Sequence, residues 1–304
     1  MTIFISIASY RDPELIRTVK SAIDNAHNPQ DLFFGLVVQD FIEKIPDMSW
    51  IPNLNLVTMT IKEARGAGYA RSKAMGLYSN QDYFLQIDSH TVFAKDWDLL
   101  CIDELSKAEK ISGNNKIILS YFPPPFHIEL NKEITYPKKD KERKPYPTKQ
   151  IPLLNKRNEW TALRVEFDDK TFSNPEESST VLGGFIFAKG DIVKEVPYDQ
   201  EISFFGEEIC FAMRAWTRGW DIYSPSKTIL YHFYSREGYK KIWKDSNIRR
   251  NSWTEIEEIS RDKQMRVLCG IEDGPYGAGN IRSLKEYEVF CGHKFKEFYS
   301  IDFD

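Results

Sequence analysis

The chain has 304 residues, which is enough for one large domain or two small ones with a substantial buried core. Its formal charge of −4 and isoelectric point near 5.9 argue against a general nucleic-acid binder. No apolar run approaches the length that spans a bilayer, and the first strand begins at Ile3 without a basic leader, so we expect a cytoplasmic enzyme. The widely spaced cysteines predict reduced core residues rather than disulfides or a zinc site; they are Cys101, Cys210, Cys269 and Cys291.

The first 121 residues alternate between strand and helix patterns. Asp12-Pro13-Glu14 is typical of a helix start, with Asp12 as the capping carboxylate. Alternation of this length favours an α/β fold with a mostly parallel, Rossmann-like central sheet and flanking helices. The expected strands are 3–7, 32–39, 54–61, 83–87 and 116–121, and the later helices are 66–78 and 97–108.

Residues 122–160 break this pattern and predict a long irregular insert. The segment is rich in proline and carries a basic stretch formed by Lys138, Lys139, Lys141, Arg143, Lys144 and Lys149. It is interpreted either as a solvated surface loop or as a loop on the acceptor side. Regular patterns resume at 162–167, 180–188, 207–218 and 221–224, and a helical tail follows Gly238. We therefore expect one domain, with a nucleotide-binding half at 1–121 and an acceptor and sugar half at 161–304.

Asp88-Ser89-His90 directly follows the apolar strand 83–87. Side chains one residue apart lie on the same side of an extended backbone, and ligands bind at the carboxyl ends of strands in α/β sheets. A carboxylate oxygen and an imidazole nitrogen suit a divalent ion such as Mn²⁺. The alternative is a polar turn that closes a buried strand. His232, which follows a later strand, is either a third ligand or a core histidine.

Two further segments lie where a nucleotide is expected. At the exit of the first strand, Tyr10 can stack on a base and Arg11 can meet a phosphate, although Arg11 also fits a helix start without any ligand. The segment 65–71 places glycines and two arginines at a helix N-terminus, which favours phosphate. Its spacing is shorter than G-x-G-x-x-G, which argues against an NAD site.

Two segments in the second half complete the pattern. Gly183-Gly184 inside an apolar stretch suggests backbone that lies against a ligand. Glu207 and Glu208 open a helix, where one acid satisfies the helix dipole and the other can grip sugar hydroxyls or lie beneath the reacting carbon.

The order of these segments resembles the Skp1-type polypeptide N-acetylglucosaminyltransferases, relatives of the mucin-type polypeptide N-acetylgalactosaminyltransferases. The matching segments cover most of the chain, and residues 122–160 match least. They are IASYRD, ARGAGYARSKA, QIDSHTVF, VLGGFIF, FFGEEICFAMRAWTRGWDIYSP, YHFYSR and GNIRSLKEYEVFCGHKF.

The resemblance implies a GT-A fold, a UDP-sugar donor with N-acetylglucosamine as the expected sugar, Mn²⁺ or Mg²⁺, and retention of the anomeric configuration. It implies metal ligation by Asp88, His90 and His232, and catalytic roles for Glu207 and Glu208. The nucleotide- and sugar-binding residues that it implies are Ala8, Ser9, Tyr10, Arg11, Arg65, Gly66, Arg71, Gln86, Asp88, Ser89, Gly183 and Gly184.

The mechanism and the acceptor stay open at this level. Same-face attack by an acceptor hydroxyl competes with a mechanism in which Glu208 is the nucleophile. The family acts on a hydroxyproline of a ubiquitin-ligase subunit, and a polypeptide acceptor is expected here. Residues 138–149 favour hydroxymethylated bases in DNA as an alternative acceptor. A non-catalytic nucleotide-sugar-binding module is a third interpretation, against which the intact Asp88–His90 pair and Glu207-Glu208 argue.

Overall fold

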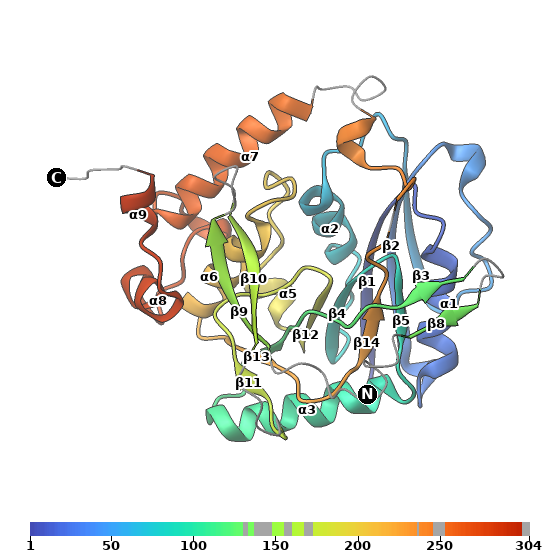
Figure 1. Cartoon of the computed structure of the whole chain (residues 1–304), viewed down its shortest axis with the longest axis horizontal. Helices are drawn as coiled ribbons and strands as arrows, with labels where there is room; N and C mark the ends of the chain where they lie inside the picture. Colours follow the sequence, from blue (N-terminus) through green and yellow to red (C-terminus); the bar gives the residue numbers. More distant parts are fainter. Residues whose placement is uncertain are drawn as a thin grey trace.

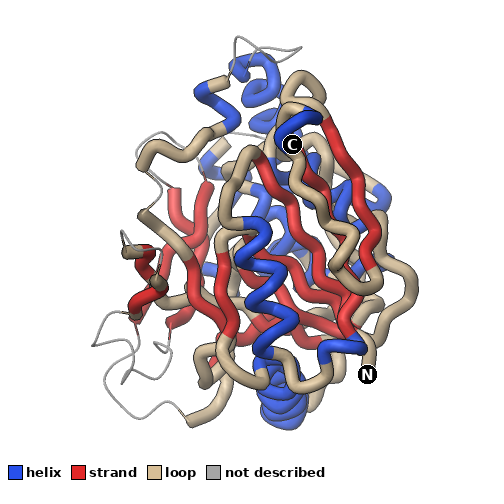
Figure 2. The backbone as a smooth tube through the Cα atoms, turned by 90° about the vertical axis from the view of Figure 1, so that its right-hand side faces the viewer, coloured by secondary structure: helices blue, strands red, loops and turns tan. Residues whose placement is uncertain are grey.

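The computed structural model describes residues 1–129, 133–136, 148–154, 160–166, 173–235, 237–245 and 253–299. An eight-stranded sheet in the order β11-β13-β6-β12-β4-β1-β2-β3 forms the centre (Figures 1 and 2). Four of its neighbouring pairs are parallel, and the pairs on both sides of β12 and the β11–β13 pair are antiparallel. The strands are β1 Ile3–Tyr10, β2 Leu32–Gln39, β3 Leu54–Met59, β4 Tyr83–Asp88, β6 Ile117–Leu119, β11 Glu176–Glu177, β12 Phe185–Lys189 and β13 Asp221–Ser224.

Helices cover both faces of this sheet. Alternate residues of β1 enter opposite cores: Ile5 packs in the cluster that contains residues of α1 (Leu15–Asn25) and α3 (Trp97–Ser112), and Phe4 in the cluster that contains residues of α2 (Ala67–Met75) and α6 (Glu207–Thr217). Strands buried on both faces explain the nearly continuous apolar runs that the sequence shows. The mostly parallel, helix-flanked sheet that the sequence predicts is confirmed.

The helical tail packs onto the main body. A third core joins α6 to α7 (Trp253–Leu268), α8 (Leu284–Cys291) and α9 (Phe295–Phe298), around Trp160 and Tyr287. All four cysteines are buried thiols, in agreement with the sequence prediction. Within the part of the chain that the structure describes, no helix combines the length and the apolar composition needed to cross a membrane. A short helix, α5 (Ile192–Glu195), follows β12.

The prediction of a wholly irregular insert at 122–160 is wrong. β7 (His127–Ile128) pairs with β8 (Ile134–Thr135), and β9 (Thr148–Leu154) pairs with β10 (Trp160–Glu166). Pro152 in β9 hides the strand pattern, yet a two-stranded ribbon tolerates a proline because each strand has an edge. Lys138, Lys139, Lys141, Arg143 and Lys144 lie outside the described residues, and so does the side chain of Lys149.

A further small ribbon contains β14 (Leu230–His232), the strand that the sequence predicts beside His232 without giving its bounds, and β5 (Thr91–Phe93), which was not predicted because three residues are too few to show a periodicity. The two strands pair antiparallel, with His232 opposite Thr91. In the chain, β5 follows directly after β4. The β5–β14 ribbon therefore joins the two halves of the sequence beside the carboxyl end of β4.

Candidate active site

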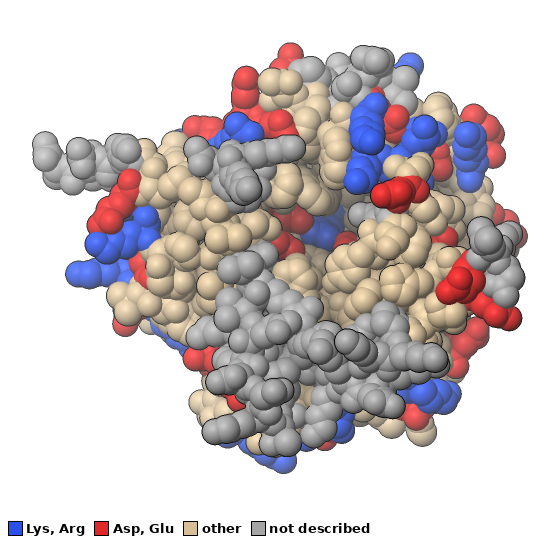
Figure 3. All heavy atoms as spheres, viewed as in Figure 1, with Lys and Arg blue, Asp and Glu red and all other residues tan. Residues whose placement is uncertain are grey.

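A cavity of about 400 Å³ opens at the carboxyl ends of β1 and β4. Figure 3 shows a hollow near the centre of the molecule, with acidic and basic side chains at its bottom and uncharged side chains around it. The cavity walls come from segments far apart in the sequence, including β1, the start of α2, the start of α6 and the segment after β14. It lies where ligands bind in α/β sheets.

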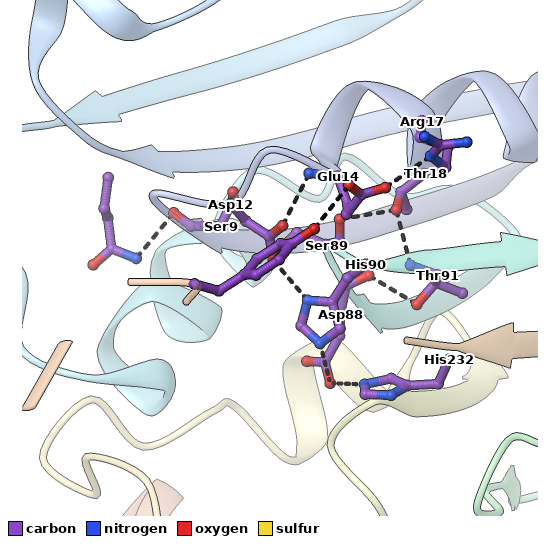
Figure 4. Close-up of polar contacts among 12 residues, drawn as sticks. Ser9, Asp12, Glu14, Arg17, Thr18, Asp88, Ser89, His90, Thr91 and His232 are labelled. Atoms are coloured by element: carbon purple, nitrogen blue, oxygen red, sulfur yellow. Dashed lines mark hydrogen bonds and ion pairs between the residues drawn. The ribbon is translucent and has the colours of Figure 1, made fainter. Parts of the chain in front are cut away.

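Three side chains that can hold a metal ion meet in this cavity. Asp88 ends β4, His90 follows it, and His232 ends β14. One ligand atom from each lies within 4.8 Å of the others. The Nε2 atoms of His232 and His90 lie 3.1 and 3.8 Å from Oδ2 of Asp88, and the two imidazole rings meet edge to face (Figure 4). The structure thus brings together all three predicted ligands.

Asp88 is held in its charged form. Burial opposes ionisation, but the hydrogen bond with His232 and the charge of Arg71 hold the pKa of Asp88 well below its usual range. Its side chain keeps 27% of its surface exposed, which leaves the carboxylate open to the cavity. A charged, accessible carboxylate beside two imidazoles is a chemically suitable site for a divalent transition-metal ion such as Mn²⁺.

Arg71 links this cluster to the helix that carries the predicted catalytic acids. Its buried guanidinium donates to Oδ1 of Asp88 at 2.8 Å and pairs with Oε1 of Glu207. Burial raises the pKa of Glu207 to about 8, although Arg71 beside it acts in the opposite direction. Glu208, at the cavity wall, accepts a hydrogen bond from the backbone N–H of Gly183 at 2.7 Å.

The paired glycines make room for protein side chains. A Cβ on Gly183 would lie 2.1 Å from Nη1 of Arg71, and a Cβ on Gly184 would lie 3.0 Å from Oδ2 of Asp88. The sequence suggests backbone that lies against a ligand at both positions. Gly184 does line the cavity, but Gly183 lies behind Arg71. Gly66 also lines the cavity, and the space of its missing side chain is filled by the carbonyl of Ser203.

The predicted nucleotide-binding residues divide into two groups. Those at the cavity wall are Ala8, Tyr10, Gly66, Arg71, Asp88, Ser89 and Gly184. Those placed elsewhere are Ser9, Arg11, Arg65, Gln86 and Gly183.

Each of the displaced residues has another partner. Arg65 is exposed and lies over the ring of Tyr69, and Gln86 is buried and donates to the carbonyl of Gly183. Arg11 pairs with Asp40 and Asp245, and Ser9 accepts a long hydrogen bond from Gln39.

Sequence reasoning missed two polar residues of the site. Gln39, at the end of β2, lines the cavity, and its buried Oε1 has no hydrogen-bond partner among the described residues. Asp12 was predicted to cap a helix, and its Oδ1 does accept the N–H of Glu14, directly before α1 begins at Leu15; its Oδ2, however, lies 2.7 Å from Nδ1 of His90. An acidic residue before a helix predicts a cap in any sequence, so only the fold reveals the contact between Asp12 and His90.

Further aromatic side chains line the cavity, and sequence reasoning missed them as well. Tyr234 and Trp243 are partly exposed there, and the ring of Phe204 packs against that of Trp243. These residues come from distant segments, and no local pattern joins them. Arg236, in the matching segment YHFYSR, lies outside the described residues.

Comparison with known proteins gives both a family match and a fold match. A family model described as glycosyltransferase (GlcNAc) matches residues 2–52 and 47–297. A crystal structure of GalNAc-T7 with UDP, GalNAc and Mn²⁺ aligns at 18% identity and a TM-score of 0.60, over 99% of this chain and 56% of that one. A structure of S. aureus TarS aligns at 15% identity and a TM-score of 0.43, over 88% of this chain and 44% of that one.

The chain therefore spans little more than half of the GalNAc-T7 chain, and the likeness to it shows a GT-A fold. Among the curated proteins that were searched, none matches.

Proposed function

Since the chain belongs to the glycosyltransferase (GlcNAc) family, we propose that it transfers N-acetylglucosamine from UDP-N-acetylglucosamine to an acceptor hydroxyl, with retention of configuration. The observation that carries the proposal is the convergence of Asp88, His90 and His232 in the cavity at the carboxyl end of β4. The GalNAc-T7 structure, which has the same fold, holds UDP, GalNAc and Mn²⁺.

The three side chains fit a divalent cation, because one carboxylate and two imidazoles supply the oxygen and nitrogen ligands that Mn²⁺ accepts. Asp88, His90 and His232 would hold the ion. When bound, a divalent ion supplies positive charge beside the diphosphate leaving group. Mg²⁺ is the alternative ion.

The chain's own residues act on either side of the bond that breaks. The glycosidic bond of the donor cleaves with the electron pair on the diphosphate, and the acceptor oxygen attacks the same face of the sugar. The acceptor proton passes to the leaving phosphate oxygen. Arg71, between Asp88 and Glu207, places a fixed positive charge at the bottom of the cavity, where it stabilises this developing negative charge.

The acids of α6 complete the sugar side of the cavity. Glu207 lines the cavity and is paired with Arg71, which places its carboxyl group where a sugar hydroxyl can reach it. Glu208 is oriented by Gly183 N–H and borders the acceptor side. The competing version, with Glu208 as nucleophile, predicts a sugar ester on that residue, which mass spectrometry of the trapped enzyme would detect.

The β1 and β2 ends form the base-binding side. Tyr10 lines the cavity, and its hydroxyl donates to Asp245 at 2.8 Å, which fixes the ring. Gln39 lies opposite Tyr10 in the strand register and lines the cavity, and its buried Oε1 has no hydrogen-bond partner among the described residues. An amide oxygen accepts the N3–H of uracil, whereas the unprotonated N3 of cytosine is itself an acceptor.

We further propose a polypeptide acceptor, as in the Skp1-type enzymes, and a single catalytic domain formed by the chain. The DNA alternative has no support in the structure, because the basic residues that favour it lie outside its described part. A cytoplasmic location stays a prediction from the sequence.

The test is a transfer reaction with UDP-N-acetylglucosamine, Mn²⁺ and a lysate of the host, followed by mass detection of glycosylated products. We expect acceptors that carry one added N-acetylhexosamine, and no product in excess chelator. Following the sugar distinguishes transfer from hydrolysis, which also releases UDP. Sugar release to water alone, or no reaction with any nucleotide sugar, would overturn the proposal and favour a binding module.

A further inference from the structure

We infer that Asp12 is a positioning residue that fixes the tautomer and orientation of His90, so that Nε2 of His90 faces the proposed cation. The inference rests on the proposed function, in which His90 is a metal ligand. Asp12 is not itself one of the proposed ligands, and it lies in the turn after a different strand, β1. Figure 4 shows Asp12 on the side of His90 away from Asp88 and His232.

The turn after β1 directs Asp12 toward the end of β4. Arg11 adopts a left-handed conformation with φ of 49°, which is uncommon for a side-chain-bearing residue. The turn is held by a hydrogen bond from the N–H of Arg11 to the carbonyl of Gln39, and by the pairing of the Arg11 guanidinium with Asp245. Backbone strain that persists in a well-bonded turn is a common feature of functional sites.

Helix α1 holds the turn that carries His90. Thr18 donates its hydroxyl to the carbonyl of Ser89 at 2.8 Å and accepts the N–H of Thr91 at 2.9 Å (Figure 4). The turn that carries His90 is therefore attached to the helix that follows Asp12. Both partners of the Asp12–His90 contact are positioned by backbone and side-chain hydrogen bonds that do not involve the contact itself.

Both oxygens of the Asp12 carboxylate have hydrogen-bond partners. Oδ1 accepts the N–H of Glu14 at 3.0 Å, and Oδ2 accepts the hydroxyl of Ser89 at 2.9 Å and lies 2.7 Å from Nδ1 of His90. Only 4% of the Asp12 side chain and 6% of the His90 side chain are exposed. Water therefore competes little for these bonds.

This contact determines which nitrogen of His90 can bind a cation. A carboxylate only accepts hydrogen bonds, so Nδ1 of His90 carries the proton and Nε2 carries the lone pair. Nε2 is the atom that lies near Asp88 and belongs to the cluster of three ligand atoms. A carboxylate behind a metal-binding histidine also increases the basicity of the ligand, and losing such a partner typically costs about 10- to 100-fold in metal affinity.

The test variant is Asp12→Asn. If its amide oxygen keeps the bond from Glu14 N–H, its NH₂ group faces Nδ1 of His90 and favours the tautomer that is protonated on Nε2. We expect the Kd for Mn²⁺, measured by calorimetry without nucleotide, to rise about 10- to 100-fold. Asp40→Asn is the matched control, since it also removes one negative charge beside Arg11 but does not contact His90. The Kd of this variant for Mn²⁺ should stay within about threefold of wild type.

A second measurement needs no metal and no variant of Asp12. Long-range ¹H–¹⁵N spectra of the metal-free wild-type protein report the tautomer of each histidine, and the signals of His90 are identified by their loss in His90→Gln. We expect His90 to be protonated on Nδ1. Protonation of His90 on Nε2, or an unchanged Mn²⁺ Kd in folded Asp12→Asn, would overturn this inference alone. A wild-type protein that binds no Mn²⁺ overturns the proposed metal site and this inference with it.

Discussion

Nε2 of His232 lies 3.1 Å from Oδ2 of Asp88, although 144 positions separate the two residues in the chain. The contact depends on the pairing of β5 with β14, which places His232 opposite Thr91, directly after the Asp88–His90 turn. Neither residue could make a cation site alone. The chemistry we propose therefore depends on a tertiary contact that joins the two halves of the fold.

The first prediction concerns Asp88. Asp88→Ala removes the carboxylate shared by both imidazoles and by Arg71, and we expect sugar transfer to fall by at least about 100-fold. Arg71 keeps Glu207 as a partner, so the fold should persist with a Tm within a few degrees of wild type. The control is Asp103→Ala, which removes an exposed carboxylate from α3. Undiminished transfer by Asp88→Ala would exclude the proposed metal site.

The second prediction concerns the pH dependence of stability. Burial raises the pKa of Glu207 to about 8, compared with 4.5 in the unfolded chain. Between these values the folded protein binds a proton that the unfolded chain has lost, so the free energy of unfolding falls as the pH rises from 5 to 8. Glu207→Gln removes this titration, and its Tm should decline less than that of wild type over the same range. Parallel Tm curves in metal-free buffer would contradict the assignment.

The third prediction concerns Gly183. An alanine there would place Cβ 2.1 Å from Nη1 of Arg71, and the guanidinium would have to leave Asp88 or Glu207. We expect Gly183→Ala to lose about 1–3 kcal/mol of stability in urea denaturation and to lose most of its transfer activity. Gly76→Ala is the matched control, since its new Cβ meets only ordinary contacts at 3.4 Å or more. Equal stability of the two variants would show that Arg71 can move without cost.

The fourth prediction concerns the base. If Gln39 accepts the N3–H of uracil, Gln39→Leu should raise the KM for the UDP-sugar by roughly 2- to 12-fold, with kcat little changed, because a typical net hydrogen bond contributes about 0.5–1.5 kcal/mol. Gln39→Glu keeps an acceptor of the same length but loses the amide that donates to the Ser9 carbonyl, so it should restore only part of the affinity. The hypothesis fails if both variants bind the donor as wild type does, or if kcat rather than KM changes in Gln39→Leu.

Much of the sheet could be predicted because long apolar strands carry their own signal. The bounds expected for β2 and β13 are those observed, and α3 differs only at its C-terminal end. β5 and the β7–β8 ribbon escaped prediction because strands of two or three residues have no periodicity, and they form only when the rest of the fold brings them together.

The candidate site was predictable as a set of residue types but not as a network. Asp88 and His90 could be identified because one short segment holds both, and His232 because it follows an apolar strand. The roles of Arg71, Gly183 and Asp12 depend on contacts between residues far apart in the chain, such as Arg71 with Glu207. Local patterns carry no information about such contacts.

The short β5–β14 ribbon restricts where insertions and deletions can occur in the evolution of this protein. Loops between residues 94 and 229 can lengthen or shorten while the pairing of His232 with Thr91 stays in place. A single inserted or deleted residue inside either three-residue strand would shift the pairing by one position and turn the imidazole to the opposite face of the ribbon. Selection for the cluster should therefore forbid length changes in these six residues more strictly than changes in their side chains.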